Sequence, residues 1–396
     1  MNKYLNEPTK SSDMDQKKMK HKIARHRRLN FYKMLALIAV VAIAGVSLYF
    51  YWDSVVYTDY EVKQTYSFQK SSDAYIKKLG DSILVYSKDG MSCIDNKGKT
   101  LWNQTYEIQN PIVRTCKNVV AIGDYNGRSI YVASNEKILG TINTATPIRD
   151  FCVAANGIVA AVQDDGTVTS IYIYDTSGNN PVYFRTTMSK SGYPLGVDIS
   201  DDGKQVAVSY LKAEAGEIST NIGFYNFSAV GQNYTDNLVS GYGYQDQIIP
   251  VISYMNNDSA FALGDHKLIF YQGSQIPINV ADIWINDEIK SVFYDRNYVG
   301  LIFADATEGA KYRLDIYNTS GTLVGKIPFD MEYKDVLFDT NSIIIYNDNE
   351  CKIYNWKQYL KYEGIFQEQI SFILQANSVD KFTYVTEDKI QNIQLH

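Results

Sequence analysis

IYNTSGTLVGKI, residues Ile316 to Ile327, is the stretch from which the fold of this 396-residue chain can be inferred. It is similar to IYDTSGNNPVYF (Ile173 to Phe184) and, more loosely, to IDNKGKTLW (Ile94 to Trp102). In each segment an apolar run enters a turn that contains Asp or Asn and then Gly, and further apolar residues follow. These residue types are typical of tight turns between β-strands. The chain therefore contains a repeated β-hairpin.

Each hairpin belongs to a longer repeated unit that opens with a short apolar strand. Four openings carry a proline, at Pro111, Pro147, Pro194 and Pro250. Four others lack it, near Tyr75, Ile289, Tyr333 and Phe372. The openings are separated by about 36 to about 56 residues, and a period near 40–45 with four strands per unit is typical of β-propeller blades. The sequence therefore predicts an all-β propeller.

The number of blades follows from the length of the repeated region. Residues 60–396 provide eight units of about 42 residues, whereas seven blades, the alternative, would need about 48 residues each. The last unit, from Ile370, shows only three strands, while the alternating segment Tyr60 to Gln69 has no unit of its own. We predict that this segment closes the ring as the outermost strand of the last blade, which leaves no long open edge. The insert Lys212 to Thr220 is expected to extend one hairpin.

A second feature, MLALIAVVAIAGVSLYFYW (Met34 to Trp52), has no charged residue and matches the roughly 20 helical residues that cross a bilayer. Residues 1–33 hold ten Lys or Arg against three acids, and such basic flanks stay in the cytoplasm. We therefore predict a largely disordered cytoplasmic tail (1–33), a single transmembrane helix in contact with lipid (34–52), a short tether (53–59) and an extracellular propeller (60–396) in the cell membrane.

A cleaved signal peptide is the alternative to a membrane anchor, because Ala42-Ile43-Ala44 resembles a cleavage site. The charged region before it is about thirty residues long and the apolar run continues past the site, so we favour the uncleaved anchor. The basic tail either binds anionic lipid or a cytoplasmic partner, or only sets the topology, and we favour the last of these.

Composition limits the partners of the exported part. Beyond residue 33 the chain keeps 28 of the 38 basic residues and 41 of the 44 acidic ones, a net charge of −13. Repulsion disfavours nucleic acid, anionic lipid and anionic wall polymers as partners, although solubility alone also explains the charge.

Residues for catalysis are scarce in this sequence. Three of its four histidines lie in the tail or at the last position, and only His266 is left, in what we interpret as a solvated hairpin turn. Asp-Gly pairs such as Asp202-Gly203 are interpreted as turns as well, because Asp bonds its own backbone there. No motif for a metal, a nucleotide or nucleophilic catalysis is present, so the sequence predicts no enzyme, and no catalytic, cofactor or metal residue is assigned.

The four cysteines are Cys93, Cys116, Cys152 and Cys351, and none has CxxC or metal-ligand spacing. Cys116 and Cys152 end similar strands of neighbouring units, which usually lie too far apart for a disulfide. We expect buried free thiols.

Two sets of residues are candidates for binding. Arg114 and Arg149 follow opening prolines on strands that would line the central channel, where they either face an anionic ligand or, the interpretation we favour, pair with carboxylates. Tyr242-Gly243-Tyr244 is either an exposed binding loop or part of the packing between blades.

Two short motifs resemble known propeller repeats. DNKGKTLW (Asp95 to Trp102) resembles the end of a pyrroloquinoline-quinone-type repeat, which implies that Trp102 packs between blades. ISDDGKQVAVS (Ile199 to Ser209) resembles the core of TolB-type repeats, with Asp201 in place of the usual proline. Taken whole, the chain resembles a family of membrane-anchored propellers of unknown function from Gram-positive anaerobes.

Two functions remain after these exclusions. The first, which we favour, is a membrane-tethered interaction platform for an exported or membrane protein, and it predicts exposed, partly apolar patches and no convergent polar pocket. The alternative is a small-ligand sensor or enzyme at the mouth of the propeller channel, and it predicts ionisable groups from several blades converging there.

Overall fold

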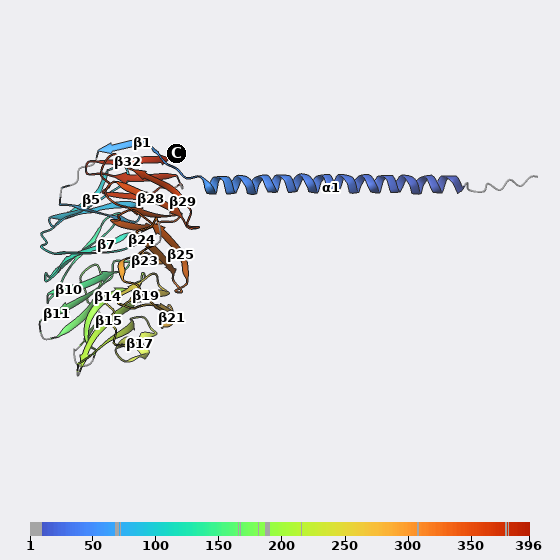
Figure 1. The fold of residues 1–396 in the computed structure, drawn as a ribbon. Coiled ribbons are helices and arrows are strands. Elements are labelled where there is room, and N and C mark those ends of the chain that lie inside the picture. Colours follow the sequence, from blue (N-terminus) through green and yellow to red (C-terminus); the bar gives the residue numbers. More distant parts are fainter. Residues whose placement is uncertain are drawn as a thin grey trace, which may run out of the picture. The chain divides into compact units, whose positions relative to one another are not determined.

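The computed structural model describes residues 10–396 except 68–70, 72, 165, 167, 181, 187–190, 215, 307–308, 377 and 379. The chain divides into two compact units, Met1–Val56 and Tyr57–His396. In the second unit, the described residues form eight four-stranded antiparallel sheets, shown in Figure 1. The predicted eight-bladed β-propeller is confirmed, and the seven-bladed alternative is wrong.

The first strands of most neighbouring blades contact one another, so the first strands surround the central channel. Blades 1 and 2 consist of β2 (Tyr75–Leu79), β3 (Ser82–Tyr86), β4 (Gly90–Ile94), β5 (Thr100–Thr105), and β6 (Pro111–Cys116), β7 (Val119–Asp124), β8 (Ser129–Ser134), β9 (Ile138–Asn143). Blades 3 and 4 consist of β10 (Ile148–Val153), β11 (Val159–Asp164), β12 (Thr169–Tyr174), β13 (Val182–Thr186), and β14 (Tyr193–Ile199), β15 (Gln205–Glu214), β16 (Glu217–Asn226), β17 (Leu238–Gln245). Two 3₁₀ turns, η1 (Gly231–Asn233) and η2 (Thr235–Asn237), precede β17.

The second half of the ring repeats this arrangement. Blades 5 and 6 consist of β18 (Val251–Tyr254), β19 (Ser259–Leu263), β20 (Lys267–Gln272), β21 (Ile278–Trp284), and β22 (Ile289–Tyr294), β23 (Tyr298–Ala304), β24 (Tyr312–Asn318), β25 (Leu323–Phe329). Blades 7 and 8 consist of β26 (Asp335–Phe338), β27 (Ser342–Tyr346), β28 (Glu350–Asn355), β29 (Leu360–Ile365), and β30 (Phe372–Gln375), β31 (Lys381–Val385), β32 (Lys389–Leu395) and β1 (Tyr60–Ser67).

Hydrophobic patterning explains where each strand lies in its blade. Second strands such as β19 and β27 are buried at every position, because both faces of the sheet are covered by neighbouring blades. Along outermost strands such as β21 and β25, exposed residues alternate with more buried ones, as expected at the rim.

The ring is closed by β1, as predicted. This strand pairs antiparallel with β32, from Tyr60 opposite Leu395 to Ser67 opposite Lys389. Figure 1 shows the blue β1 beside the red β32. The last blade therefore combines the first strand of the propeller with the last three.

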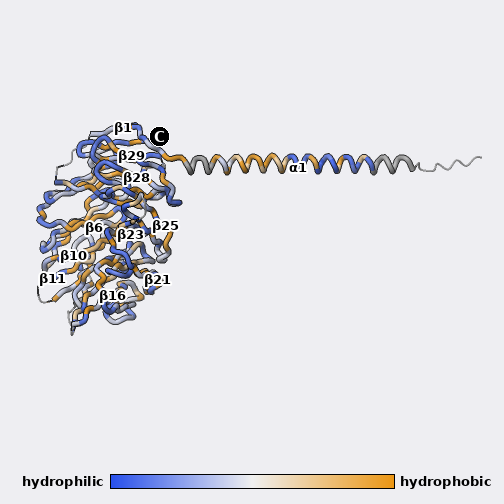
Figure 2. The backbone as a smooth tube through the Cα atoms, viewed as in Figure 1, coloured by the Kyte–Doolittle hydropathy of each residue, from blue (hydrophilic) through white to orange (hydrophobic). Residues whose placement is uncertain are grey.

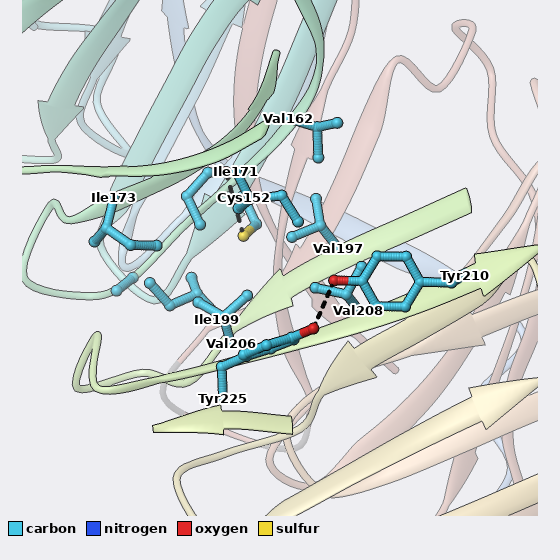
Figure 3. Close-up of a cluster of buried hydrophobic side chains, with 12 residues drawn as sticks. Cys152, Val162, Ile171, Ile173, Val197, Ile199, Val206, Val208, Tyr210 and Tyr225 are labelled. Atoms are coloured by element: carbon cyan, nitrogen blue, oxygen red, sulfur yellow. Dashed lines mark hydrogen bonds between the residues drawn. The ribbon is translucent and has the colours of Figure 1, made fainter. Parts of the chain in front are cut away.

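Eight buried hydrophobic clusters join the blades around the ring. Each cluster fills one space between neighbouring blades, and the cluster with Ile83 and Phe372 joins blade 1 to blade 8. Figure 3 shows the cluster between blades 3 and 4, where Tyr210 and Tyr225 bond through their hydroxyls at 2.9 Å. Figure 2 shows the corresponding apolar strands in orange.

The turns that identified the repeat share one geometry. Asp175 Oδ1 accepts the N–H groups of Ser177 and Asn179, and Gly178 between them has a φ of 83°. Asn318 accepts in the same way from Ser320 and Thr322, and Asp95 from Lys97 and Lys99. A positive φ favours glycine, which explains the shared Asx-x-x-Gly spacing.

The insert in blade 4 forms the expected extended hairpin. β15 and β16 have ten residues each and stay paired from Gln205 opposite Asn226 to Glu214 opposite Glu217. The residue at the tip, 215, lies outside the described residues.

The first unit is one helix, α1 (Lys10–Ser54), and Lys18–Leu48 within it is long and apolar enough to cross a membrane. Figure 2 shows its apolar stretch in orange and its basic stretch in blue. The helix begins 24 residues before Met34, whereas we expected residues 1–33 to be largely disordered. Residues 10–33 contain neither Gly nor Pro and continue an already formed helix, so they extend it without a new nucleation cost. Residues 1–9 lie outside the described part.

Candidate functional site

Ionisable side chains from several innermost strands face the channel. Arg114 on β6 donates from Nη2 to Asp150 Oδ1 on β10 at 2.8 Å, and from Nε to the Phe151 carbonyl at 3.2 Å. Burial raises the pKa of Asp150, and the Arg114 charge opposes this. Pairing of Arg114 with a neighbouring carboxylate, the interpretation we favoured, is therefore found.

Asp198, on β14, is the most perturbed carboxyl group in the channel. Its Oδ2 accepts the Ser253 hydroxyl at 2.6 Å and the Tyr254 N–H at 2.8 Å, and its Oδ1 accepts the Ile199 N–H at 2.9 Å. Burial raises the pKa of Asp198 to about 6, although these hydrogen bonds favour the charged form. The group therefore titrates close to neutral pH.

Lys77, on β2, brings a second cation into the channel near Arg114. It is accessible to solvent but enclosed by the channel walls, and this burial, together with Arg114, lowers its pKa. Across from it, burial raises the pKa of Asp335 on β26. Groups from at least five blades thus converge, as the ligand-binding alternative predicted and contrary to what the platform hypothesis predicted.

One end of the channel is bridged by an ion cluster. Asp201, in the turn between β14 and β15, is 8% exposed and accepts from Arg296 Nη2 of blade 6. It also lies 3.4 Å from Lys117 Nζ of blade 2 and accepts the Cys116 thiol at 3.1 Å. Asp201 therefore links three alternate blades across the axis and braces this end of the ring.

The opposite end of β10 and β14 carries a cavity of about 190 Å³. Both strands are interrupted by a register shift there, at Arg149 and at Leu195. A β-bulge bends its strand and turns the extra side chain in a new direction. The cavity is lined by Tyr125, Arg149, Asp150, Val162, Tyr193, Pro194, Leu195, Gly196 and Val197.

Arg149 is held at this cavity by its neighbours. It donates from Nη1 to Asn126 Oδ1, its Cζ lies 5.8 Å from the centre of the Tyr125 ring, and its Nε lies 3.5 Å from Asp164 Oδ2. Within the described structure the buried Nε has no hydrogen-bond acceptor. The sequence pointed to Arg149 but not to the cavity, because the bulges depend on strand register.

The rim of blade 5 carries an exposed apolar row. Ile278, Val280 and Trp284 on β21 are 57%, 39% and 63% exposed, while Ala281 and Ile283 between them pack toward blade 6. Nothing in the sequence separates this outermost strand from the other seven, so sequence analysis did not single it out.

Other candidate residues have structural positions. Trp102 donates from Nε1 to the Ser134 carbonyl at 2.8 Å between blades 1 and 2, as predicted for a packing residue. Tyr242 and Tyr244 pack between blades 4 and 5, so the exposed-loop interpretation is wrong. His266 lies in the exposed turn between β19 and β20, as predicted.

The cysteines are free thiols, of which Cys93, Cys152 and Cys351 are buried and Cys116 is half-buried. Burial raises the pKa of each thiol. Among the residues that the structure describes, no group of three or more His, Cys, Asp or Glu is placed to hold a metal ion.

Residues 53–395 match the family of unknown function DUF5711, and the chain belongs to this family. No curated protein matches its sequence.

Solved structures with the same architecture are remote in sequence. Sqt1 from Chaetomium thermophilum is 10% identical with a TM-score of 0.51, and the similarity covers 84% of this chain and 98% of that one. BamB from Moraxella catarrhalis is 12% identical with a TM-score of 0.47, covering 85% and 100%. The Pan2 WD40 domain from Neurospora crassa is 9% identical with a TM-score of 0.42, covering 72% and 88%. At these identities the similarity concerns the fold alone.

Proposed function

We propose that this DUF5711 protein is a membrane-tethered, extracytoplasmic propeller that binds a protein partner at the rim of blade 5. The observation that carries the proposal is the apolar row on β21. Trp284, 63% exposed, is the largest side chain in the row, and tryptophan is enriched among residues that dominate binding energy. Exposed apolar side chains that gather on one face mark interaction sites, and here three of the four exposed positions of β21 are apolar.

The surroundings of the row favour one kind of partner. Three acids lie in or just after the row, Asp282, Asp287 and Glu288, and each pairs with a cation of this chain, Lys267, Arg313 and Lys290 respectively. The local charges therefore balance, and the preference for a basic partner rests on the charge of the whole domain. The exported part as a whole has a net charge of −13. We therefore expect an exported or membrane protein whose contact surface is apolar and flanked by Lys or Arg, because complementary charge steers association.

The tether in this proposal is helix α1. Its apolar side chains, including Leu37 and Ile43 at 64% and 66% exposed, are unfavourable in water and suit a hydrocarbon environment. The excess of Lys and Arg before Met34 favours a cytoplasmic N-terminus and an extracellular propeller. The same basic stretch supports the anchor over a cleaved signal peptide.

In-cell photocrosslinking of the full chain tests the partner site. A photoreactive phenylalanine replaces Ile278 in β21, and Thr141, exposed on the outermost strand of blade 2, provides the matched control. We expect one recurrent protein crosslinked from Ile278 and not from Thr141, through a peptide that contains basic residues.

A second variant excludes nonspecific capture. Trp284→Ala in the Ile278-labelled protein is expected to remove the crosslink without changing the melting temperature, because Trp284 is on the rim. Equal capture from both positions, or a crosslink unaffected by Trp284→Ala, would contradict the proposal.

A further inference from the structure

The cavity at Arg149 has the chemistry of a ligand site that is separate from the blade 5 rim. Its volume of about 190 Å³ exceeds that of a dry cavity of about 150 Å³ known to hold benzene, so one six-membered ring with substituents fits. It lies at the start of β10 and β14, the end opposite to the turn that carries Asp201.

A buried donor in this cavity lacks an acceptor. Arg149 Nε–H has no hydrogen bond in the described structure, and burying an unpaired donor is unfavourable. Asp164 does not supply one: its Oδ2 is 3.5 Å away, beyond the roughly 2.7–2.9 Å of charge-assisted bonds. Asp164 Oδ1 already accepts the Gly166 N–H at 2.7 Å, which holds the carboxylate in place.

The charges around the cavity cancel. Two lining residues are charged, Arg149 and Asp150, one of each sign. Just outside the lining, Arg149 lies beside Asp164 and Asp150 pairs with Arg114. An anion would be placed near both carboxylates, whereas a neutral ligand meets no net field. The ligand class favoured by the charges is therefore uncharged, with groups that both accept and donate.

Hydroxyl groups satisfy both requirements. One hydroxyl oxygen can accept from the guanidinium of Arg149, whose side chain is 28% exposed, and a neighbouring hydroxyl can donate to the Asp150 carboxylate. The remaining walls include Tyr125, Tyr193 and Leu195, which suit the C–H faces of a ring. Tyr125 is 44% exposed, so the entrance is open to solvent.

We propose that the cavity between blades 3 and 4 binds a neutral sugar ring, with Arg149 as hydrogen-bond donor and Tyr125 at its entrance. The proposal goes beyond the platform function and does not depend on it. The open entrance lets the site take either a free monosaccharide or the terminal residue of a glycan.

Saturation-transfer NMR on the full chain tests the sugar site. The protein is placed in lipid nanodiscs, since sugar-based detergents would compete, and probed with glucose, galactose and N-acetylglucosamine. We expect ring-proton transfer from at least one sugar, with an apparent Kd of ~1 mM. No transfer from any of the three would overturn the proposal.

Variants locate the binding. Arg149→Gln and Tyr125→Ala should each weaken binding about tenfold, whereas Arg128→Gln should not change it. Arg128, on the same side of blade 2, bonds to the Ala145 carbonyl and does not line the cavity. Unchanged binding in Arg149→Gln with an intact melting temperature overturns the assignment. Acetate binding that requires Arg149, without sugar binding, would replace the neutral ligand by an anion.

Discussion

Replacing Asp198 by asparagine should change the pH dependence of propeller stability. The pKa of Asp198 is about 6 in the folded protein against 3.8 for the free group. Between these values the folded state keeps a proton that the unfolded state has lost, so folding stability falls as pH rises through this window. The asparagine side chain has no titratable proton, so in Asp198→Asn the fall should disappear.

The size of the effect follows from the shift. A difference of about 2.2 pKa units corresponds to about 3 kcal/mol at roughly 1.36 kcal/mol per unit. Partial access of Asp198 to channel water reduces this to about 1–3 kcal/mol. For a domain of about 340 residues the unfolding entropy is about 0.7 kcal/mol/K, so the melting temperature should change by about 2–4 °C.

Thermal unfolding followed by circular dichroism at pH 4 to 8 measures this difference. Residues 57–396 contain all eight sheets and the closing strand, so this fragment is suitable. From pH 4 to 7 wild type should lose about 2–4 °C relative to Asp198→Asn.

Asp202→Asn provides the control from the same blade. Burial raises the pKa of Asp202, but hydrogen bonds from Ser200 and Lys204 outweigh it and the pKa is lowered overall. Its contribution is complete above about pH 5 and is lost as the pH falls below that, so its curve should parallel wild type between about pH 5 and pH 8. If the Asp198→Asn curve also parallels wild type, burial does not perturb this carboxyl group and the reasoning fails.

Three further outcomes are expected. Removing β1 (Tyr60–Ser67) breaks seven residue pairs between β1 and β32, so the free energy of unfolding of the fragment should fall by about 4–7 kcal/mol. Its melting temperature, followed by circular dichroism, should fall by about 5–10 °C. An unchanged melting temperature would refute ring closure by this strand. Asp201→Ala should lower the free energy of unfolding, measured by chemical denaturation, by about 1–3 kcal/mol, because Arg296 and Lys117 lose their shared acceptor. A smaller loss than that of Asp202→Ala would argue against the link across the channel. The full chain should stay in the membrane pellet after alkaline carbonate extraction. Protease added to intact cells should digest its propeller, and a propeller protected from that protease would reverse the predicted topology.

Local regularities made most of the propeller predictable. The turns at Asp175 and Asn318 can be recognised in the sequence because an Asx side chain and a positive-φ glycine have fixed spacing. A fourth turn of the same geometry, at Asn355, escaped notice because Gln358, with a φ of 68°, takes the glycine position. Ring closure was predictable because one unit lacked a strand and one strand lacked a unit.

Long-range placement was not predictable from the repeats. Asp201 stands in the same Asp-Asp-Gly segment as Asp202, which behaves as a turn carboxylate and accepts the Lys204 N–H. Asp201 instead contacts Arg296, 95 residues away, and Cys116, 85 residues away. These contacts depend on how three blades are rotated about the axis, which no local pattern records.

Some of the features that distinguish one blade from another lie where the repeat is broken. Asp201 stands where the TolB-type pattern has proline, and Arg149 occupies an extra position that shifts the register of β10. A fully regular ring would present eight equivalent faces and could not orient a single ligand or partner. Residues that maintain the repeat, such as Trp102 and Gly178, stabilise the ring. The register shifts at Arg149 and Leu195 accompany the cavity between blades 3 and 4, whereas the apolar rim of blade 5 arises without a break in the repeat. Functional variants should therefore be sought at irregular positions and on the exposed rim.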